Sequence, residues 1–386
     1  MRVPKTIYRI ESVLAQHLPL RPAQIRGLAL WIHGTLLAHS ACQSAVLCAL
    51  TLHGSYHALR QRLREWLYDG HDKAAPCQTQ VEVERCFAPL LRWVLAWWCG
   101  RELALALDAT TCRDRVTVLA VSVLYRGCAI PVAWAVLPGN QPGPWLAAIL
   151  GLLDQLRPAV PERVTVLVLA DRGLWSPRLW AHIRALGWHP LLRVQNHTGV
   201  TPAHQPPCTA RDLVRPGQAW IGRVRLGRRQ LDVTLIVVWR AGQAQPCAVV
   251  TDLAPDRAGA GWYGLRMWAE LGFRALKGLG WQWQRSRRTD PRRVARHWLV
   301  LAVCSLWTLA HGTRCEQAQR AGVPPARLRT PVVLDASGRD REISVLRRGL
   351  QQLCALLMRG GPWRRLWLQP EPWPQPPPDL EVFVHV

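Results

Sequence analysis

Three consecutive segments between residues 102 and 139 constrain the fold more than any other part of the sequence. They read LALALDATT, RVTVLAVSVLYRG and CAIPVAWAVLPG, and only short polar or glycine-containing breaks separate them. Their apolar and β-branched residues predict three successive strands. Because the connections are too short for a crossover, we expect the strands to pair antiparallel.

The segments that follow predict that helices cover this sheet. Pro144 opens a helical pattern, PWLAAILGLLDQLRP, which Pro158 stops. VTVLVLADRG then has the continuous apolar character of a buried parallel strand, and it ends in Asp171. The next segment, SPRLWAHIRALG, predicts a helix with Ser176 at its N-cap. The order of strands and helices indicates an α/β fold with a mixed sheet.

The remaining chain divides into three regions around this sheet. Residues 7–100 show helical periodicity, residues 189–255 form a β-rich insertion, and residues 298–310 predict a buried helix. The end, QPEPWPQPPPDLEVFVHV, predicts an extended tail. We therefore expect a helical domain over residues 1–100, an α/β domain over 101–312 and a C-terminal helical region with a Pro-rich tail over 313–386.

The charge of the chain indicates a polyanionic partner. The 49 basic residues exceed the 25 acidic ones, giving a formal charge of +24. A GC-rich coding sequence would replace Lys by Arg without creating this excess, so the charge favours nucleic acid. In YHALRQRLREWLYDG, the arginines Arg60, Arg62 and Arg64 either lie on DNA or form a solvated helix face. We expect the N-terminal helical domain to bind DNA.

The cysteines and apolar runs indicate a cytoplasmic protein. None of the twelve cysteines forms a Cys-x-x-Cys pair, and those between residues 42 and 99 stand among apolar neighbours, which predicts buried thiols in a reducing compartment. The N-terminus lacks the apolar core of a signal peptide, and the longest uncharged apolar run, residues 298–310, is too short to span a bilayer. We expect no membrane partner.

The stretch YGLRMWAELGFRALK carries four polar residues at helical spacing. Arg266, Glu270 and Lys277 follow Tyr263 by 3, 7 and 14 residues, which places all four near one helix face. Glu270 has an ordinary alternative, because Arg266 and Arg274 are each four residues away and either would pair with it on a solvated face.

Two aspartates on apolar strands are candidates to lie beside the polar residues of this helix. Asp108 and Asp171 stand at or near the carboxyl ends of strands that are commonly neighbours in such a sheet, so both carboxylates can face one crevice. Glu270 would add a third carboxylate. Three converging oxygen ligands suit Mg²⁺ or Mn²⁺, and a pair of such ions catalyses phosphoryl displacement.

In this order, LALDATT, VLADRG and Tyr-x2-Arg-x3-Glu-x6-Lys resemble the DDE transposases of bacterial insertion sequences, specifically the insertion sequence 4 family. The resemblance covers about residues 102–310. It implies an RNase H-like catalytic core with a β-rich insertion, in which Asp108, Asp171 and Glu270 are catalytic and hold two Mg²⁺ or Mn²⁺ ions. Tyr263, Arg266 and Lys277 would bind DNA phosphates.

The resemblance also implies partners and a location. The expected partners are the terminal inverted repeats of the element and a target DNA, bound by a homodimer in a bacterial cytoplasm, at the nucleoid. Four further residues are candidates for DNA contact, either as a stacking and phosphate-binding patch or as packing residues and solvated side chains: Arg172, Trp281, Trp283 and Arg285.

Two alternatives to a transposase remain open on the sequence alone. One is a structure-selective nuclease with the same RNase H-like core, which cuts DNA without strand transfer. The other is a catalytically inactive DNA-binding protein derived from a transposase. The presence of Asp108, Asp171 and Glu270 argues against loss of catalysis.

Overall fold

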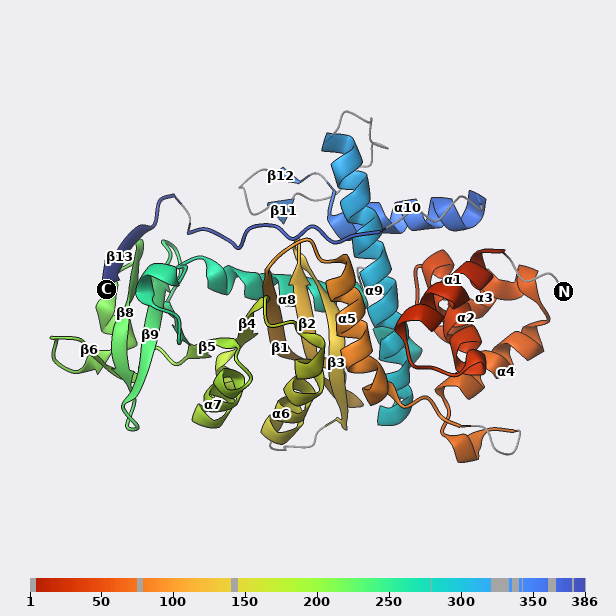
Figure 1. Ribbon diagram of the computed structural model, residues 1–386, viewed down its shortest axis with the longest axis horizontal. Coiled ribbons are helices and arrows are strands. Elements are labelled where there is room, and N and C mark those ends of the chain that lie inside the picture. The colour runs from red at the N-terminus through yellow and green to blue at the C-terminus, as the bar shows by residue number, and fades with distance from the viewer. Residues whose placement is uncertain are drawn as a thin grey trace.

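The computed structural model describes residues 5–74, 79–139, 145–278, 280–320, 333–334, 340–341, 343–359, 366–376 and 378–385. Within these residues a long mixed sheet runs through the molecule, with a helical domain at one end of it (Figure 1). The helix expected to open at Pro144 is present, but residues 140–144 themselves lie outside the described ranges.

The N-terminal region is helical, as the periodicity predicts. Its packing is set by apolar residues on facing helices: Ile7, Ile10 and Leu14 of the first helix are buried, as are most residues of the second. Five α-helices form this region: α1 (Lys5–His17), α2 (Pro22–Ala38), α3 (Gln43–Leu50), α4 (Tyr56–Leu67) and α5 (Phe87–Trp97).

The sheet has eleven strands within the described residues, in the order β3-β2-β1-β4-β5-β10-β9-β8-β6-β7, and β13 joins it beside β8. The first part consists of β1 (Glu102–Cys112), β2 (Val116–Tyr125), β3 (Cys128–Pro138), β4 (Thr165–Ala170) and β5 (His189–Val194). The second part consists of β6 (Gly199–Pro202), β7 (Cys208–Thr209), β8 (Gln218–Leu226), β9 (Leu231–Trp239), β10 (Cys247–Thr251) and β13 (Glu381–His385).

The pairing follows the short and long connections of the chain. β1, β2 and β3 form an antiparallel meander, whereas β4 and β5 follow crossover helices and run parallel to β1. β10 pairs antiparallel with β5, so the insertion strands extend the same sheet. Two short strands, β6 and β7, are present that the sequence did not predict.

Side-chain alternation gives the sheet two different faces. On one face, Leu103, Leu105 and Leu107 join a core with α6 (Trp145–Leu156), α7 (Pro177–Ala185) and α9 (Pro291–Arg320). On the other face, Ala104 and Ala106 lie with Leu265 and Ala269, at the start and middle of α8 (Arg266–Leu276). Small side chains therefore line the face that receives α8.

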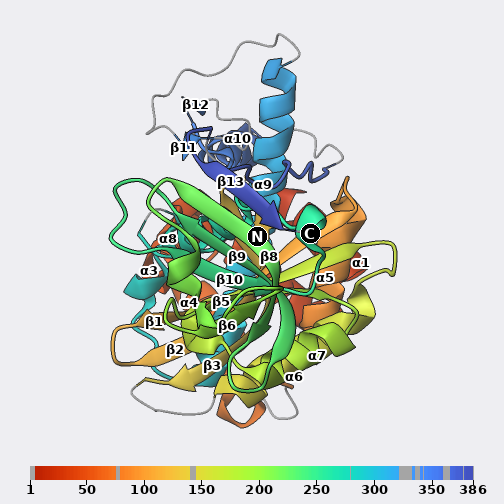
Figure 2. The same ribbon diagram turned by 90° about the vertical axis from the view of Figure 1, so that its left-hand side faces the viewer.

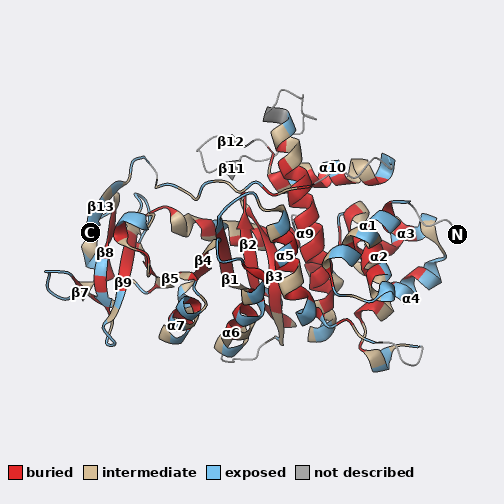
Figure 3. Ribbon diagram, viewed as in Figure 1, coloured by how far each residue is buried: buried red, intermediate tan, exposed pale blue. Residues whose placement is uncertain are grey.

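The predicted buried helix is the middle of α9, where residues 298–310 are all buried. This helix stands between the N-terminal helices and the edge strand β3 (Figures 1 and 3), and it packs against both. It extends past residue 312, where the sequence placed a boundary, and α10 (Val345–Arg359) crosses it. β11 (Val333–Leu334) and β12 (Asp340–Arg341) form a separate small ladder.

The Pro-rich end is extended, as its composition predicts, but it is packed along its length. We call residues 366–385, as far as they are described, the C-terminal strap. Leu368 pairs with the backbone at Trp97, Glu371 binds Arg126, and Trp373 contacts Trp262 at a ring distance of 4.8 Å. The strap ends as β13, which lies parallel to β8 (Figure 2). It joins the helical end of the molecule to the insertion.

Two further sequence expectations meet the structure. The cysteines described form no disulfide, and Cys48 and Cys99 are exposed, so not all of them are the buried thiols that their neighbours predict. No single described helix is both long and apolar enough to cross a membrane. One pair of described helices meets the requirement of length and composition together: α2, and α3 with its 3₁₀ extension, which follow each other with a bend of 91°.

Candidate active site

Strand register places Asp108 and Asp171 side by side. Leu107 of β1 is opposite Ala170 of β4 in the parallel pair, and each aspartate is the next residue along. Because side chains alternate, Asp108 shares the face of Ala106, and Asp171 shares the face of Leu169. Both carboxylates therefore point to the face covered by α8.

Both aspartates are also fixed by their own backbone. Asp108 accepts a hydrogen bond at 2.8 Å from the backbone N–H of Ala109, and Asp171 accepts one at 2.8 Å from that of Arg172. Asp171 is the N-cap of the 3₁₀ turn η5 (Arg172–Leu174), where a carboxylate satisfies a free N–H group.

Arg266 joins the two carboxylates. Its Nη2 atom lies 3.0 Å from Oδ2 of Asp171 and 3.8 Å from Oδ2 of Asp108. The Tyr263 hydroxyl donates to Oδ1 of Asp171 at 3.3 Å, and Arg193 Nη1 lies 3.3 Å from the same oxygen. Two of the four signature residues thus contact Asp171 directly.

The signature stretch is not one continuous helix. Tyr263 belongs to the 3₁₀ turn η8 (Trp262–Leu265), α8 begins at Arg266, and Lys277 follows its last residue with ψ −122°. The sequence-based expectation of a single helical face is therefore wrong at both ends. Arg266 and Tyr263 still reach the aspartates, because a 3₁₀ turn also brings residues three apart to one side.

A glycine allows α8 to lie close to the sheet. Gly272 is buried against β3, and a Cβ atom there would stand 2.5 Å from the Cβ of Ala129 and 2.9 Å from its backbone nitrogen. A larger side chain would push the helix outward. Gly272 and the alanines of β1 together set the distance between α8 and the aspartates.

Glu270 lies near the two aspartates but does not bind them. Its carboxylate pairs with Arg274 at 2.7 Å, which is the helix-surface pair expected as the ordinary alternative. The side chain is 45% exposed. Its negative charge nonetheless contributes to raising the pKa of Asp108. Glu270 is thus close enough to act with the aspartates electrostatically.

The two aspartates titrate in opposite directions. Burial raises the pKa of Asp108, the charges of Asp171 and Glu270 add to the rise, and Arg266 opposes it. Burial also acts to raise the pKa of Asp171, but the Arg172 N–H and the guanidinium groups of Arg266 and Arg193 together hold it below its ordinary value. The opposite directions follow from the greater burial of Asp108 and from the closer approach of Arg266 to Asp171.

The residues present fit a divalent cation by their chemistry. Carboxylate oxygens from β1, β4 and α8 are the hard donors that Mg²⁺ and Mn²⁺ prefer. Arg266, at 27% exposure, is the positive group between the two aspartates in this structure. We interpret it as a protein cation at a position where the carboxylates require positive charge.

The other candidate residues are distributed differently. Lys277 is partly buried, burial lowers its pKa, and it lies near Cys112 at the end of β1. It forms no hydrogen bond or ion pair with Asp108 or Asp171. Arg172 and Arg285 are exposed, so a DNA contact by either stays a prediction.

The prediction of a DNA-stacking patch is wrong for its two tryptophans, Trp281 and Trp283. Trp281 and Trp283 are 0% and 1% exposed, because they pack under α9. Trp281 donates to Ser305 Oγ at 3.0 Å, and Trp283 meets Trp298 edge to face at 5.4 Å. Their rings are core residues and present no face for a base to stack on.

Sequence reasoning missed Arg193. This residue of β5 binds Asp171 and lies 5.7 Å from the ring centre of Tyr263. It also lines a cavity of about 330 Å³ between α8 and the strands β9 and β10, together with Arg240, Tyr263 and Arg266. The signal in the sequence was a single basic residue within the apolar strand PLLRV.

A second acidic group lies in the N-terminal domain. Ligand atoms of Asp69, His71 and Asp72 all come within 4.8 Å of one another. Both aspartates, however, bind arginines near the start of α9: Asp69 pairs with Arg292 and Arg296, and Asp72 with Arg293. The carboxylates of this group are therefore already paired with arginine side chains.

Comparison with known proteins finds a family model and twelve chains of solved structures. Residues 134–307 match the family described as the transposase DDE domain. A cryo-EM structure of the piggyBac transposase synaptic complex with hairpin DNA aligns over 92% of this chain and 82% of that one, with 9% identity and a TM-score of 0.34. No curated protein matches.

The matched range includes Asp171, Tyr263, Arg266 and Glu270, and it begins after Asp108. Asp108 lies outside the matched range, and the pairing of β1 with β4 brings it next to Asp171. The match to the transposase DDE domain, together with this mixed α/β architecture, supports a DDE transposase.

Proposed function

We propose that the protein is a DNA transposase of the insertion sequence 4 family, which binds the ends of its element and catalyses metal-dependent cleavage and strand transfer. One observation carries the proposal: Asp108, Asp171 and the turn and helix bearing Tyr263, Arg266 and Glu270 converge at one edge of the sheet. The family match over residues 134–307 supports it.

The strand order also supports an RNase H-like core. A meander of β3, β2 and β1 followed by parallel β4 and β5 brings Asp108 and Asp171 together beneath α8, the helix that carries Glu270. In this proposal residues 189–255 are the β-rich insertion, whose first strand β5 pairs with β4, and residues 1–100 bind DNA. Two copies would hold the two ends of one element.

Asp108, Asp171 and Glu270 would hold Mg²⁺ or Mn²⁺, which when bound supplies activation of the attacking oxygen and stabilisation of the leaving oxygen. Arg266 would have different partners with and without the metal ion. Arg266 binds both aspartates here, and a cation placed between them would repel its guanidinium. Arg266 would then hold a DNA phosphate beside the carboxylates, with Tyr263 and Arg193 as neighbouring donors.

Cleavage by a Glu270→Gln variant tests the proposal. The substitution removes a negative ligand and nearly preserves shape, so DNA binding should survive. Full-length protein is incubated with Mg²⁺ or Mn²⁺ and with DNA that carries the ends flanking the coding sequence, and nicked and joined products are scored separately. The same substitution at exposed Glu162 is the matched control.

Wild type and Glu162→Gln should cleave and join, and Glu270→Gln should do neither. Cleavage without joining in the wild type would instead favour a structure-selective nuclease. Binding without any product in all three proteins would favour an inactive DNA-binding protein. Equal activity of Glu270→Gln and wild type would contradict the assignment of Glu270.

A further inference from the structure

Two cavities in the N-terminal domain join into one groove. A cavity of about 420 Å³ lies between α2 and α4, and a second of about 490 Å³ lies toward α1. Both are lined by Arg26, Leu30 and Arg62, so they meet at these three residues. We call this combined feature the α2–α4 groove.

A tryptophan and a glycine form the floor of the groove. Trp66 of α4 is buried and donates through Nε1 to the backbone oxygen of Gln24 at 2.8 Å. The ring lies against Gly27, where a Cβ atom would be 2.3 Å from Cδ1 of the indole. The two helices are therefore held at a fixed separation, and the groove between them is a built feature of the domain.

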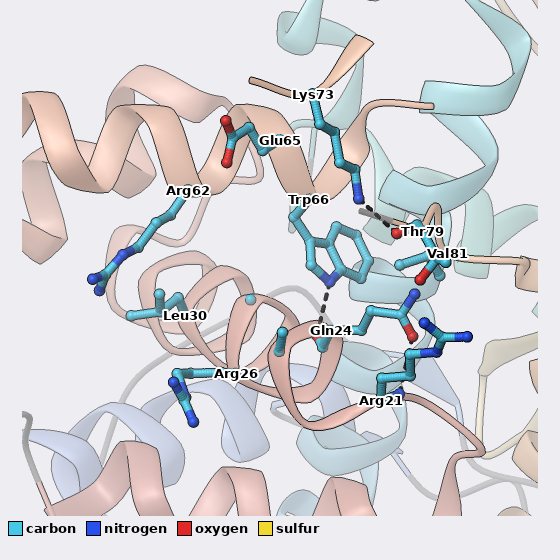
Figure 4. Close-up of a pocket in the computed structure, with 12 residues that line it drawn as sticks. Arg21, Gln24, Arg26, Leu30, Arg62, Glu65, Trp66, Lys73, Thr79 and Val81 are labelled. Carbon is cyan, nitrogen blue, oxygen red and sulfur yellow. Dashed lines mark hydrogen bonds between the residues drawn. The ribbon is translucent and has the colours of Figure 1, made fainter. Parts of the chain in front are cut away.

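The walls of the groove are basic. Arg21, Arg26, Arg62 and Lys73 line it, against the acidic residues Glu11 and Glu65. In Figure 4, Arg26 and Arg62 extend from different helices past Leu30 to the same end, and Arg21 lies at the other end. A ligand lying between α2 and α4 would meet these basic side chains, whereas the part of the groove toward α1 is lined by Glu11, His53 and apolar residues.

The side chains of two of these arginines make no hydrogen bond or ion pair within the described part of the chain. Arg26 and Arg62 are exposed, and neither has a hydrogen bond or ion pair with a described residue. Arg64, two residues along α4, instead donates to the Tyr68 hydroxyl at 2.9 Å. Glu65 accepts a hydrogen bond from Gln61 at 2.6 Å and forms no ion pair with Arg62, both being described residues. The sequence presented Arg62 and Arg64 as equivalent, and the structure separates them.

We propose that the α2–α4 groove binds the phosphate backbone of duplex DNA, with Arg26 and Arg62 as its principal phosphate contacts. The proposal rests on the proposed function, because it concerns the same DNA. Charge complementarity selects this occupant: the basic side chains that line the groove between α2 and α4 suit a strand whose phosphates recur, and the chain carries a formal charge of +24.

The test compares DNA binding by two double variants of the full-length protein. Arg26→Gln with Arg62→Gln removes the two proposed contacts. Arg92→Gln with Arg163→Gln removes the same charge at two other exposed arginines. Both pairs are placed in the Glu270→Gln background, and the affinity for a labelled end duplex is measured by fluorescence anisotropy over a range of salt concentrations, without divalent metal.

The groove variant should bind about tenfold more weakly at moderate salt, and its plot of log affinity against log salt should be less steep by about 1.8, at roughly 0.9 per phosphate contact. The control pair should keep the slope. Arg26→Lys with Arg62→Lys should recover most of the slope, because the charge returns, and circular dichroism checks that each variant is folded.

An unchanged slope in a folded groove variant would overturn the proposal, and so would an equal change in the control pair. The result is independent of catalysis, because binding is measured without metal and in a cleavage-deficient background. A protein that never cleaves DNA would overturn the proposed function and leave the groove result standing.

Discussion

The two acidic groups of this protein, Asp69–His71–Asp72 and Asp108–Asp171–Glu270, differ in how firmly their arginines are held. In the first group Arg296 is 4% exposed and binds Asp69 together with the backbone oxygens of Val81 and Leu67. In the second group Arg266 is 27% exposed, and among the described residues it forms ion pairs with the two aspartates alone. One arginine is anchored on three sides, whereas the other is held only by the carboxylates it neutralises.

The difference shows why proximity does not identify a metal centre. The first group is the tighter of the two, but the pKa of Asp69 indicates that its carboxylate is already paired with arginines. Burial acts to raise the pKa of Asp69, and hydrogen bonds and charge from Arg296 and Arg292 lower it overall. Asp108 has a raised pKa instead. The looser group is the one that retains a demand for positive charge.

The largest expected difference is in stability. Arg296→Met should destabilise the N-terminal domain by roughly 3–5 kcal/mol, because it leaves Asp69 buried without its main partner. Arg266→Met should change stability by less than about 1 kcal/mol, since its pairs are partly exposed. Urea denaturation followed by tryptophan fluorescence measures both. Equal losses would remove the distinction between an anchored and a displaceable arginine.

The second-largest expected difference between the two acidic groups is in stabilisation by a bound metal ion. With Mg²⁺ or Mn²⁺ at a hundred times its dissociation constant, the wild type should gain about 2.7 kcal/mol, seen as a higher melting temperature that EDTA reverses. Asp171→Asn should lose this gain and Asp72→Asn should keep it. The reverse pattern would assign the ion to the N-terminal group and contradict the proposed site.

The smallest effect is a pH dependence of opposite sign. The lowered pKa of Asp69 gives stability that is present above its ordinary value of 3.8 and is lost as the pH falls through the folded value. The raised pKa of Asp108 gives stability that is present below 3.8 and is lost as the pH rises through the folded value.

In EDTA at neutral pH, Asp69→Asn should therefore be less stable than wild type and Asp108→Asn more stable, and both differences should shrink under acid conditions. Melting temperatures measured from neutral to acid pH test this. A loss of stability in Asp108→Asn at neutral pH would show that its carboxylate is already compensated.

Much of the sheet could be predicted because its signals are local. β1 to β5, α6, α7 and the buried middle of α9 follow from strand composition, proline positions and the Ser176 cap. The neighbouring positions of Asp108 and Asp171 follow from ordinary sheet connectivity. These features depend on residues close together in the chain or on general topology.

The features that were missed depend on distant contacts. Trp281 and Trp283 stand among arginines in the sequence, and only their packing under α9 reveals them as core residues. The helix start at Arg266 has no strong local signal, because its N-cap residue is Leu265, which makes no side-chain capping hydrogen bond. Arg193 reaches Asp171 from a strand 22 positions along the chain.

The C-terminal strap completes the sheet with a strand that is synthesised last, beside a strand made much earlier. Gln218 of β8 and Glu381 of β13 are 163 residues apart in sequence and adjacent in the sheet. A chain made from its N-terminus therefore carries β8 with part of its outer edge unpaired until the strap has been synthesised, and an open edge is where strands of another chain can add. The strap thus also acts as a late closure against mispairing between nascent copies, and it closes the sheet only after α8 and the residues of the candidate active site have been made.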